Sequence, residues 1–230
     1  MRHFMFTLPI LSFAALQFCG SILGQDQSET SLEKVYSTDF SGAESEWEFV
    51  DKGWRFFKSD EGQVVLSQHL KENDYQPPFR SPRHMALLKE VHVTDFEINV
   101  KVKSTHADYG HRDVCLFFGY QSDSEFYYVH LGQRTDDHAN QIFIVNKAAR
   151  TKISSKTTDG TPWDDEWHDV KITRQATSGE IRVYFDDMES PVMEATDKTF
   201  GWGQVGLGSF DDTADWDDFS LLGETYEADK

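Results

Sequence analysis

Two runs of alternating apolar and polar residues face each other across a short polar turn in the second half of the chain. The first covers residues 167–174 and the second residues 180–187, and the turn between them ends at Gly179. The apolar members all share one face: Val170, Ile172, Ile181, Val183 and Phe185. Side chains alternate between the two faces of a strand, so this pattern predicts an antiparallel β-hairpin with one buried face.

Extended segments of the same kind recur along the chain at short spacing. The clearest covers residues 91–103, in which apolar residues alternate with charged and polar ones. Other predicted strands are residues 35–40, 47–50, 54–57, 63–66, 114–120, 126–131, 141–146, 152–155, 205–210 and 216–222. No long helical pattern, internal repeat or second domain competes with them, so we expect an all-β sandwich or jelly roll.

Residues 1–24 have the features of a secretory leader. Arg2 supplies a positive start, residues 4–18 are mostly apolar, and Gly24 precedes the expected cut. This predicts a protein that is secreted, periplasmic or held in the cell envelope. A single membrane helix is an alternative, although the run is shorter than the roughly 20 residues that spanning requires. Lipid anchoring at Cys19 is a second alternative. The expected organisation is a leader at 1–24, a flexible segment at 25–34, one domain at 35–224 and a tail at 225–230.

Charge and cysteine content narrow the possible partners. The formal net charge of -18 disfavours nucleic acid and anionic membrane surfaces, which would repel the chain. Removal of the leader would leave Cys115 without a partner for an internal disulfide. Cys115 lies in an apolar run, and we expect it to behave as a small buried hydrophobe rather than a catalytic thiol.

Several short motifs follow one another in a recognisable order from about residue 39 to residue 223. They are residues 39–42 with Trp47, residues 95–98, 126–132 and 144–146, the hairpin that starts at Trp167, and residues 206–212. This order resembles secreted bacterial domains of the concanavalin A-like and laminin-G-like kind, near the 3-keto-disaccharide hydrolase domain family. The resemblance implies a two-sheet antiparallel jelly-roll sandwich, a scaffold that hosts both binders and enzymes. Residues 111–113 depart from it, because His-Arg-Asp stands where that family often carries Asn-Ser-Gly.

The strand at residues 126–131 indicates where a ligand would bind. Tyr127, Val129 and Leu131 are expected to fill the core, so that Tyr128 and His130 point to the opposite, concave face of the sheet. Sugars are bound by aromatic faces and by polar side chains that reach hydroxyl groups. The candidate carbohydrate-binding residues are Tyr128, His130, Arg134, Asn140 and Arg150.

Catalysis is a second possibility on the same face. The sequence lacks the Glu-x-Asp-x-x-Glu motif of laminarinase-type glycosidases, and the alternating Glu44, Glu46 and Glu48 fit solvated charges. If the protein is an enzyme, His130, Asp136 and His138 are the acid–base candidates. The leading hypothesis is an exported, non-catalytic glycan-binding or interaction module. The alternatives are a hydrolase or lyase acting on 3-keto-glycosides and a structural envelope protein.

A structural calcium ion is the cofactor that the resemblance implies. In many jelly rolls of this type the first and last strands lie together and share an ion. Asp39 near the first strand and Asp217 on the last would supply carboxylates, which calcium prefers among six to eight oxygen ligands. Asp211, Asp212 and Asp215 form a second, weaker acidic cluster.

Overall fold

The computed structural model describes Met1 and residues 32–59 and 62–227. The expected leader and Cys19 lie outside the described residues, as does most of the segment expected to be flexible. The first strand begins at Glu33, whereas the sequence placed the start of the domain at Val35. The described part of the chain contains no helix that is long and apolar enough to cross a membrane.

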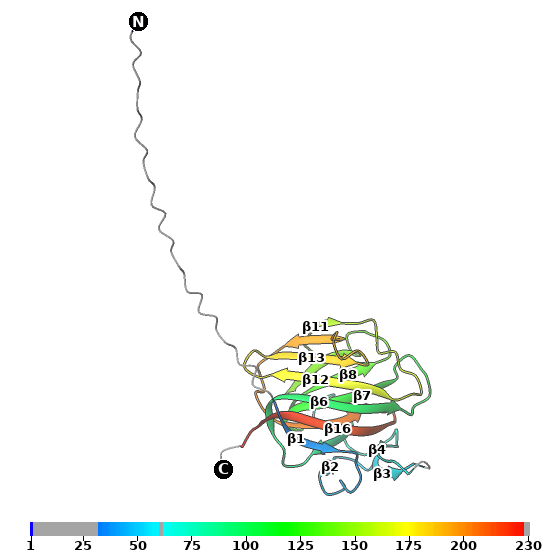
Figure 1. The fold of residues 1–230 in the computed structure, drawn as a ribbon. Helices are drawn as coiled ribbons and strands as arrows, with labels where there is room; N and C mark the ends of the chain where they lie inside the picture. Colours follow the sequence, from blue (N-terminus) through cyan, green and yellow to red (C-terminus); the bar gives the residue numbers. More distant parts are fainter. Residues whose placement is uncertain (2–31, 60–61, 228–230) are drawn as a thin grey trace. The chain divides into compact units, whose positions relative to one another are not determined.

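Within residues 32–227 the strands form two sheets, and every pairing between strands is antiparallel (Figure 1). The nine-stranded sheet has the order β11 (Ser154–Thr157), β14 (Met193–Thr196), β13 (Glu180–Phe185), β12 (His168–Gln175), β6 (Val93–Ser104), β16 (Ala214–Thr225), β4 (Val64–Gln68) and β3 (Trp54–Lys58), with β1 (Glu33–Thr38) paired to β16. The seven-stranded sheet has the order β10 (Thr151–Lys152), β9 (Gln141–Asn146), β8 (Glu125–Gly132), β7 (Asp113–Ser122), β15 (Gln204–Ser209), β5 (His84–Leu88) and β2 (Trp47–Phe49). The predicted all-β, two-sheet jelly-roll sandwich is confirmed.

The predicted hairpin is β12 and β13, and it lies in the nine-stranded sheet. Ile172 of β12 lies opposite Val183 of β13 on one side and Ile98 of β6 on the other, so one apolar row crosses three strands. Gly179 closes the hairpin turn with a φ of 81°. A Cβ there would lie 2.7 Å from the Asp197 carbonyl oxygen, which explains why the turn needs glycine.

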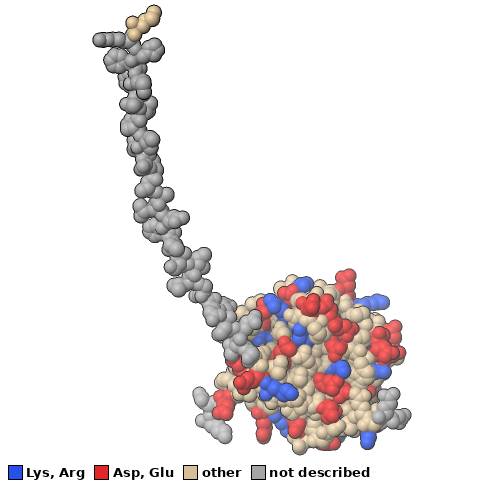
Figure 2. Space-filling model, in the orientation of Figure 1, with Lys and Arg blue, Asp and Glu red and all other residues tan. Residues whose placement is uncertain are grey.

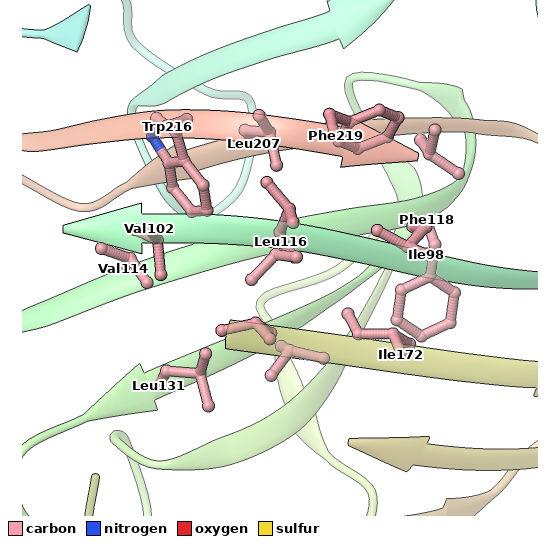
Figure 3. Packing of buried hydrophobic residues seen from close by; sticks show 14 of the residues in the cluster. Ile98, Val102, Val114, Leu116, Phe118, Leu131, Ile172, Leu207, Trp216 and Phe219 are labelled. Atoms are coloured by element: carbon pink, nitrogen blue, oxygen red, sulfur yellow. The ribbon is translucent and has the colours of Figure 1, made fainter. Parts of the chain in front are cut away.

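The main hydrophobic core fills the space between the two sheets (Figure 3). Trp216 and Phe219 of β16 both point into it, although an odd separation normally places two side chains on opposite faces. A β-bulge between Asp217 and Ser220 restores the alternation, and Asp218 takes a φ of 46° there. The bulge therefore turns Asp218 out to solvent, while Trp216 and Phe219 both stay buried in the core.

Two strands, β5 and β14, have no counterpart among the sequence predictions. Residues 84–88 form β5, whose side chains are all buried, so they show no alternation of apolar and polar residues. The short β14 lies in a segment whose sequence shows no regular period. The weak strand predicted at residues 152–155 is divided between β10 and β11, in different sheets. Cys115 is buried as expected, inside β7.

The seven-stranded sheet is apolar on both faces. Its outer face carries a second cluster of buried residues: Met85, Leu87, Cys115, Phe117, Phe126, Tyr128, Phe143 and Val145. Phe79, from the proline-bearing segment 71–83, and Phe210, after β15, pack against this cluster. These residues cover part of the outer face, and a cavity opens at one end of it.

The outer face of the nine-stranded sheet is polar instead. Acidic and basic side chains are interspersed on it, with no continuous basic area in this view (Figure 2). Exposed pairs such as Lys156–Glu194, 2.8 Å apart, contribute little to stability because water screens them. This face is a solvated surface.

Candidate functional site

A cavity of about 330 Å³ opens at the uncovered end of the seven-stranded sheet. It lies where β7 begins and β8 ends. The surrounding segments are residues 71–83 before β5, the loops β6–β7, β8–β9 and β9–β10, and the loop after β15. The side chains around it are mostly charged or aromatic: Arg80, Arg83, Tyr109, His111, Asp113, His130, Asp136, His138, Ala139, Arg150, Phe210 and Asp211.

A hydrogen-bonded histidine and aspartate form part of its floor. His130 Nε2 lies 2.9 Å from Asp113 Oδ2, and the backbone N–H of Asn140 donates to His130 Nδ1 at 3.1 Å. Because Nδ1 accepts this bond, the ring proton sits on Nε2 and is donated to Asp113. His130 is thus held as a neutral donor with both nitrogens engaged.

This arrangement bears on metal binding at Asp113, Cys115 and His130, whose ligand atoms lie within 4.8 Å of one another. A neutral histidine that binds a metal through Nε2 must carry its proton on Nδ1, and here Nδ1 is an acceptor. Burial, with the neighbouring Asp113 carboxylate, also raises the pKa of the Cys115 thiol, which keeps it protonated. The three side chains therefore form a packed, hydrogen-bonded floor rather than a metal site.

A second buried carboxylate supports the floor from below. Asp212 is fully buried, and its Oδ2 accepts the backbone N–H of Asp113 while its Oδ1 accepts the hydroxyl of Tyr109. Burial and the adjacent Asp113 charge raise the pKa of Asp212 to about 6. Tyr109, which stands at the cavity wall, is thereby anchored by its hydroxyl with its ring partly exposed.

Arg150 forms another part of the cavity wall. Its guanidinium lies over the rings of Phe143 and Phe210, 4.7 and 4.6 Å from their centroids. One nitrogen donates to the Tyr128 hydroxyl at 2.8 Å, and another donates to the His138 carbonyl. The aromatic clamp fixes the position of Arg150 at low entropic cost for a ligand.

The segment 71–83 brings two further arginines to the cavity. Its end is tied down by His84, whose Nδ1 lies 2.9 Å from Asp51 Oδ1 in a fully buried pair of side chains. Arg83 faces Asp211 at 3.9 Å, and Arg80 is exposed at the rim. No other described residue forms a hydrogen bond or ion pair with the Arg80 side chain.

The residues proposed from the sequence occupy different places around this cavity. His130, Asp136, His138 and Arg150 line it. Tyr128 points to the predicted face but is completely buried beneath Arg150. Tyr127, Val129 and Leu131 belong to the main core, as predicted.

Asn140 and Arg134 lie apart from the cavity lining. Asn140 is fully buried with a φ of 54°, and its amide binds loop groups of Thr135, Thr157 and Thr161. Its side chain organises the loops behind the site. Arg134 is exposed next to Gly110.

Sequence reasoning missed several of the lining residues. They are Arg80, Arg83, Tyr109, His111, Asp113 and Phe210, whereas Asp211 belongs to the predicted weaker acidic cluster. One signal was present: Asp113 shares its strand face with Cys115 and precedes an apolar run, where a charged side chain marks the end of a buried face. The others come from loops, whose positions the sequence does not encode locally.

The predicted calcium residues lie at the bulge of β16. Asp217 is 2% exposed, its Oδ2 accepts a hydrogen bond from Gln63, and its Oδ1 has no partner among the described residues. Burial raises the pKa of Asp217, and the charges of Asp218 and Asp39 raise it further. Asp39 is exposed and lines a neighbouring cavity of about 500 Å³ together with Asp218.

The weaker acidic cluster is divided in the structure. Asp211 and Asp212 group with Asp113 at the first cavity, with carboxylate oxygens within 4.8 Å of one another. Asp215 lies on β16 opposite Ser67 of β4 and is not part of that group.

Comparison with known proteins gives matches at the level of structure. No protein-family model and no curated protein sequence matches the chain. The carbohydrate-binding module CBM66 from Bacillus subtilis superposes with a TM-score of 0.56 at 20% identity, covering 77% of this chain and 96% of that one. A Bacillus subtilis protein of unknown function with a galectin-like fold gives 0.56 at 12% identity, covering 86% and 99%. Winged bean acidic lectin, complexed with methyl-α-D-galactose, gives 0.53 at 14% identity, covering 83% and 96%. At these identities the likeness concerns the fold alone, and the fold is a concanavalin A-like, lectin-type jelly-roll sandwich.

Proposed function

We propose that the protein is a carbohydrate-binding module whose site is the cavity at the end of the seven-stranded sheet. The observation that carries this proposal is the composition of the cavity walls. Three arginines and three aspartates surround an opening that has aromatic rings at its sides. The volume of about 330 Å³ is at the small end of ligand sites, which fits one terminal sugar residue.

The chemistry of sugar hydroxyl groups matches these walls. Each hydroxyl both donates and accepts hydrogen bonds, so a sugar needs donors and acceptors around it. Arg80 and Arg150 supply donors, Asp136 and Asp211 supply acceptors, and Tyr109 presents a partly exposed ring to apolar C–H groups. Charged partners make these hydrogen bonds stronger than neutral ones.

Binding is favoured over catalysis by the state of His130. A general base needs a free lone pair, and a general acid needs a proton directed at the substrate. The Nδ1 of His130 accepts from Asn140, and its Nε2 faces Asp113. For His130 to carry out acid–base cleavage of 3-keto-glycosides, the ring would have to give up its bond to Asn140 at Nδ1 or its bond to Asp113 at Nε2.

The names of the structural neighbours support the same proposal. One is a carbohydrate-binding module, and another is a lectin complexed with a galactoside. Residues 1–24 resemble a secretory leader. On this basis we further propose that the module acts outside the cytoplasm, where glycans of envelopes and matrices are found.

Arg80→Ala is expected to weaken glycan binding about five- to tenfold without changing the melting temperature. Arg80 is exposed at the rim and has no protein partner among the described residues, so its removal costs the ligand one charge-assisted hydrogen bond of about 1–1.5 kcal/mol. The measurement is calorimetric titration with a glycan selected from an immobilised panel. Arg55→Ala, an exposed arginine on the edge strand β3, is the control. Failure of the wild-type protein to bind any glycan in a broad panel would contradict the proposed function.

We also propose that a structural calcium ion binds between Asp39 and Asp217. Asp217 has a buried oxygen that meets no partner among residues 32–59 and 62–227, and its charge lies close to those of Asp39 and Asp218. Such an arrangement is unfavourable for an ionised carboxylate unless a cation balances it. Gln63 can supply a neutral oxygen ligand if its side chain rotates from its present bond to Asp217.

Calcium is expected to raise the melting temperature of the wild-type protein and not that of Asp217→Asn. At free calcium 100 times the dissociation constant the gain is about 2.7 kcal/mol, or roughly 5–10 °C. In chelator, Asp217→Asn is expected to melt at a higher temperature than the wild type. Because the folded state raises the pKa of Asp217, ionisation lowers stability as the pH rises above the ordinary carboxyl range, and asparagine removes that loss. Calorimetric melts with calcium and with chelator test both signs, and Asp215→Asn on the same strand is the control. A wild-type melt that ignores calcium would refute the ion.

A further inference from the structure

A second cavity adjoins the proposed sugar site across a single pair of side chains. It has a volume of about 500 Å³ and is lined by Lys71, Glu72, Asn73, Arg83 and Asp211. Arg83 and Asp211 also line the first cavity. The two cavities therefore share this pair as a common wall.

The shared pair is free to bind a ligand on both sides. Arg83 and Asp211 lie 3.9 Å apart, and their side chains are 38% and 50% exposed. At this distance and exposure the pair is weakly held. Arg83 has five N–H donors in a planar fork, of which one faces Asp211, so it can also donate to groups in either cavity.

The second cavity has its own polar wall, and its backbone is held in place. Asn73 donates to the Arg83 carbonyl at 3.0 Å, which ties residues 71–73 to the end of the same segment. The backbone carbonyl of Lys71 lies 3.2 Å from His84 Nε2. The exposed side chains of Lys71 and Glu72 form no hydrogen bond or ion pair with another described residue. The rim of the second cavity therefore carries one donor and one acceptor that are unpaired within the described part of the chain.

The wall chemistry of the second cavity repeats that of the first. Each has cationic donors and carboxylate acceptors, but the second has no aromatic ring. The second cavity is therefore suited to a hydroxyl-rich group whose ligand is already held in the first cavity. Linking two weak sites through one ligand raises the affinity because the second contact is intramolecular.

We propose that the second cavity is a subsite for the next residue of a sugar chain whose terminal residue occupies the first cavity. The inference rests on the proposed function, and it assigns the ligand as an oligosaccharide of at least two residues. The chain passes over the Arg83–Asp211 pair, which contacts both residues. Phe79 and Phe210 pack on the neighbouring apolar face of the sheet, so the sugar chain leaves over the Arg83–Asp211 pair rather than along the strands.

The test is a length series with a double variant. Gluco-, galacto-, manno- and fructo-oligosaccharides of one to four residues are titrated against the wild type, Lys71→Ala/Glu72→Ala, and the control Lys156→Ala/Glu194→Ala. The control removes an exposed lysine–glutamate pair from the edge of the nine-stranded sheet. For the series that binds, the wild type and control should gain roughly tenfold in affinity from one residue to two, with little gain beyond. The double variant should keep the monosaccharide affinity and lose the gain.

The outcomes separate this inference from the function on which it rests. Binding of the monosaccharide with no gain on lengthening, or an equal loss for all lengths in the double variant, overturns the second subsite and leaves the sugar site in place. Absence of binding at every length in all four series contradicts the carbohydrate site and the subsite together.

Discussion

Arg150→Ala should reduce carbohydrate binding by roughly 30-fold or more, the largest loss expected from a single substitution in the cavity. The guanidinium is clamped over Phe143 and Phe210, and it is fixed further by the Tyr128 hydroxyl. A donor held in this way meets a sugar hydroxyl without losing side-chain freedom on binding, so its removal costs more than that of the mobile Arg80. The measurement is titration calorimetry with the best glycan from the panel.

The control for Arg150→Ala is Arg182→Ala. Arg182 lies on β13 and pairs with Glu180 at 2.8 Å, on the sheet that faces away from the cavity. The Arg182 variant should bind as the wild type does. Arg150→Lys keeps the charge but lacks the planar fork, and we expect it to recover only part of the affinity. Equal affinity of wild type and Arg150→Ala, with both proteins folded, would remove Arg150 from the site.

The alternating strands could be predicted because the two faces of each strand have different surroundings, so apolar and polar residues alternate along it. In β12 and β13 the apolar positions fall on one face, and the structure pairs them in register with Ile98 of β6. In β8 the same argument correctly divided Tyr127 from Tyr128. Local periodicity is a property of neighbouring residues, so a sequence contains it directly.

Local periodicity could not indicate that both faces of the seven-stranded sheet are buried. Tyr128 was expected to meet a ligand because it points away from the main core. The structure covers this face with Phe79 and Phe210, which are distant from Tyr128 in sequence. Strand β5 was missed for the same reason, because burial on both faces removes the alternation on which the prediction depends.

The site itself is formed mostly by long-range contacts. Arg80 and Arg83 reach the cavity because the buried Asp51–His84 pair anchors the end of their segment. Neither the pairing of two residues 33 positions apart nor the direction of the loop follows from local sequence. His130 was found because it lies on a strand with a clear period, whereas the residues it meets come from other elements.

Gly208→Ala is expected to destabilise the protein by about 3 kcal/mol or more and to remove carbohydrate binding. A Cβ at Gly208 of β15 would lie 2.0 Å from the His84 carbonyl oxygen and 2.8 Å from Phe117 Cε2. The oxygen belongs to the backbone of β5 and cannot turn aside, so the strands must separate. Because His84 also anchors segment 71–83 through Asp51, the shift would displace the cavity wall that carries Arg80 and Arg83.

Thermal melts and glycan titration check this prediction, with Gly201→Ala as the matched control. Gly201 is exposed, and a Cβ there meets no atom within 4 Å. At about 2–4 °C per kcal/mol for a domain of this size, Gly208→Ala should melt roughly 10 °C lower, while Gly201→Ala should match the wild type. If both variants melt and bind alike, the close approach of β15 and β5 does not support the site. A lower melting temperature with full binding would show that the close packing of β15 and β5 stabilises the protein without fixing the positions of Arg80 and Arg83.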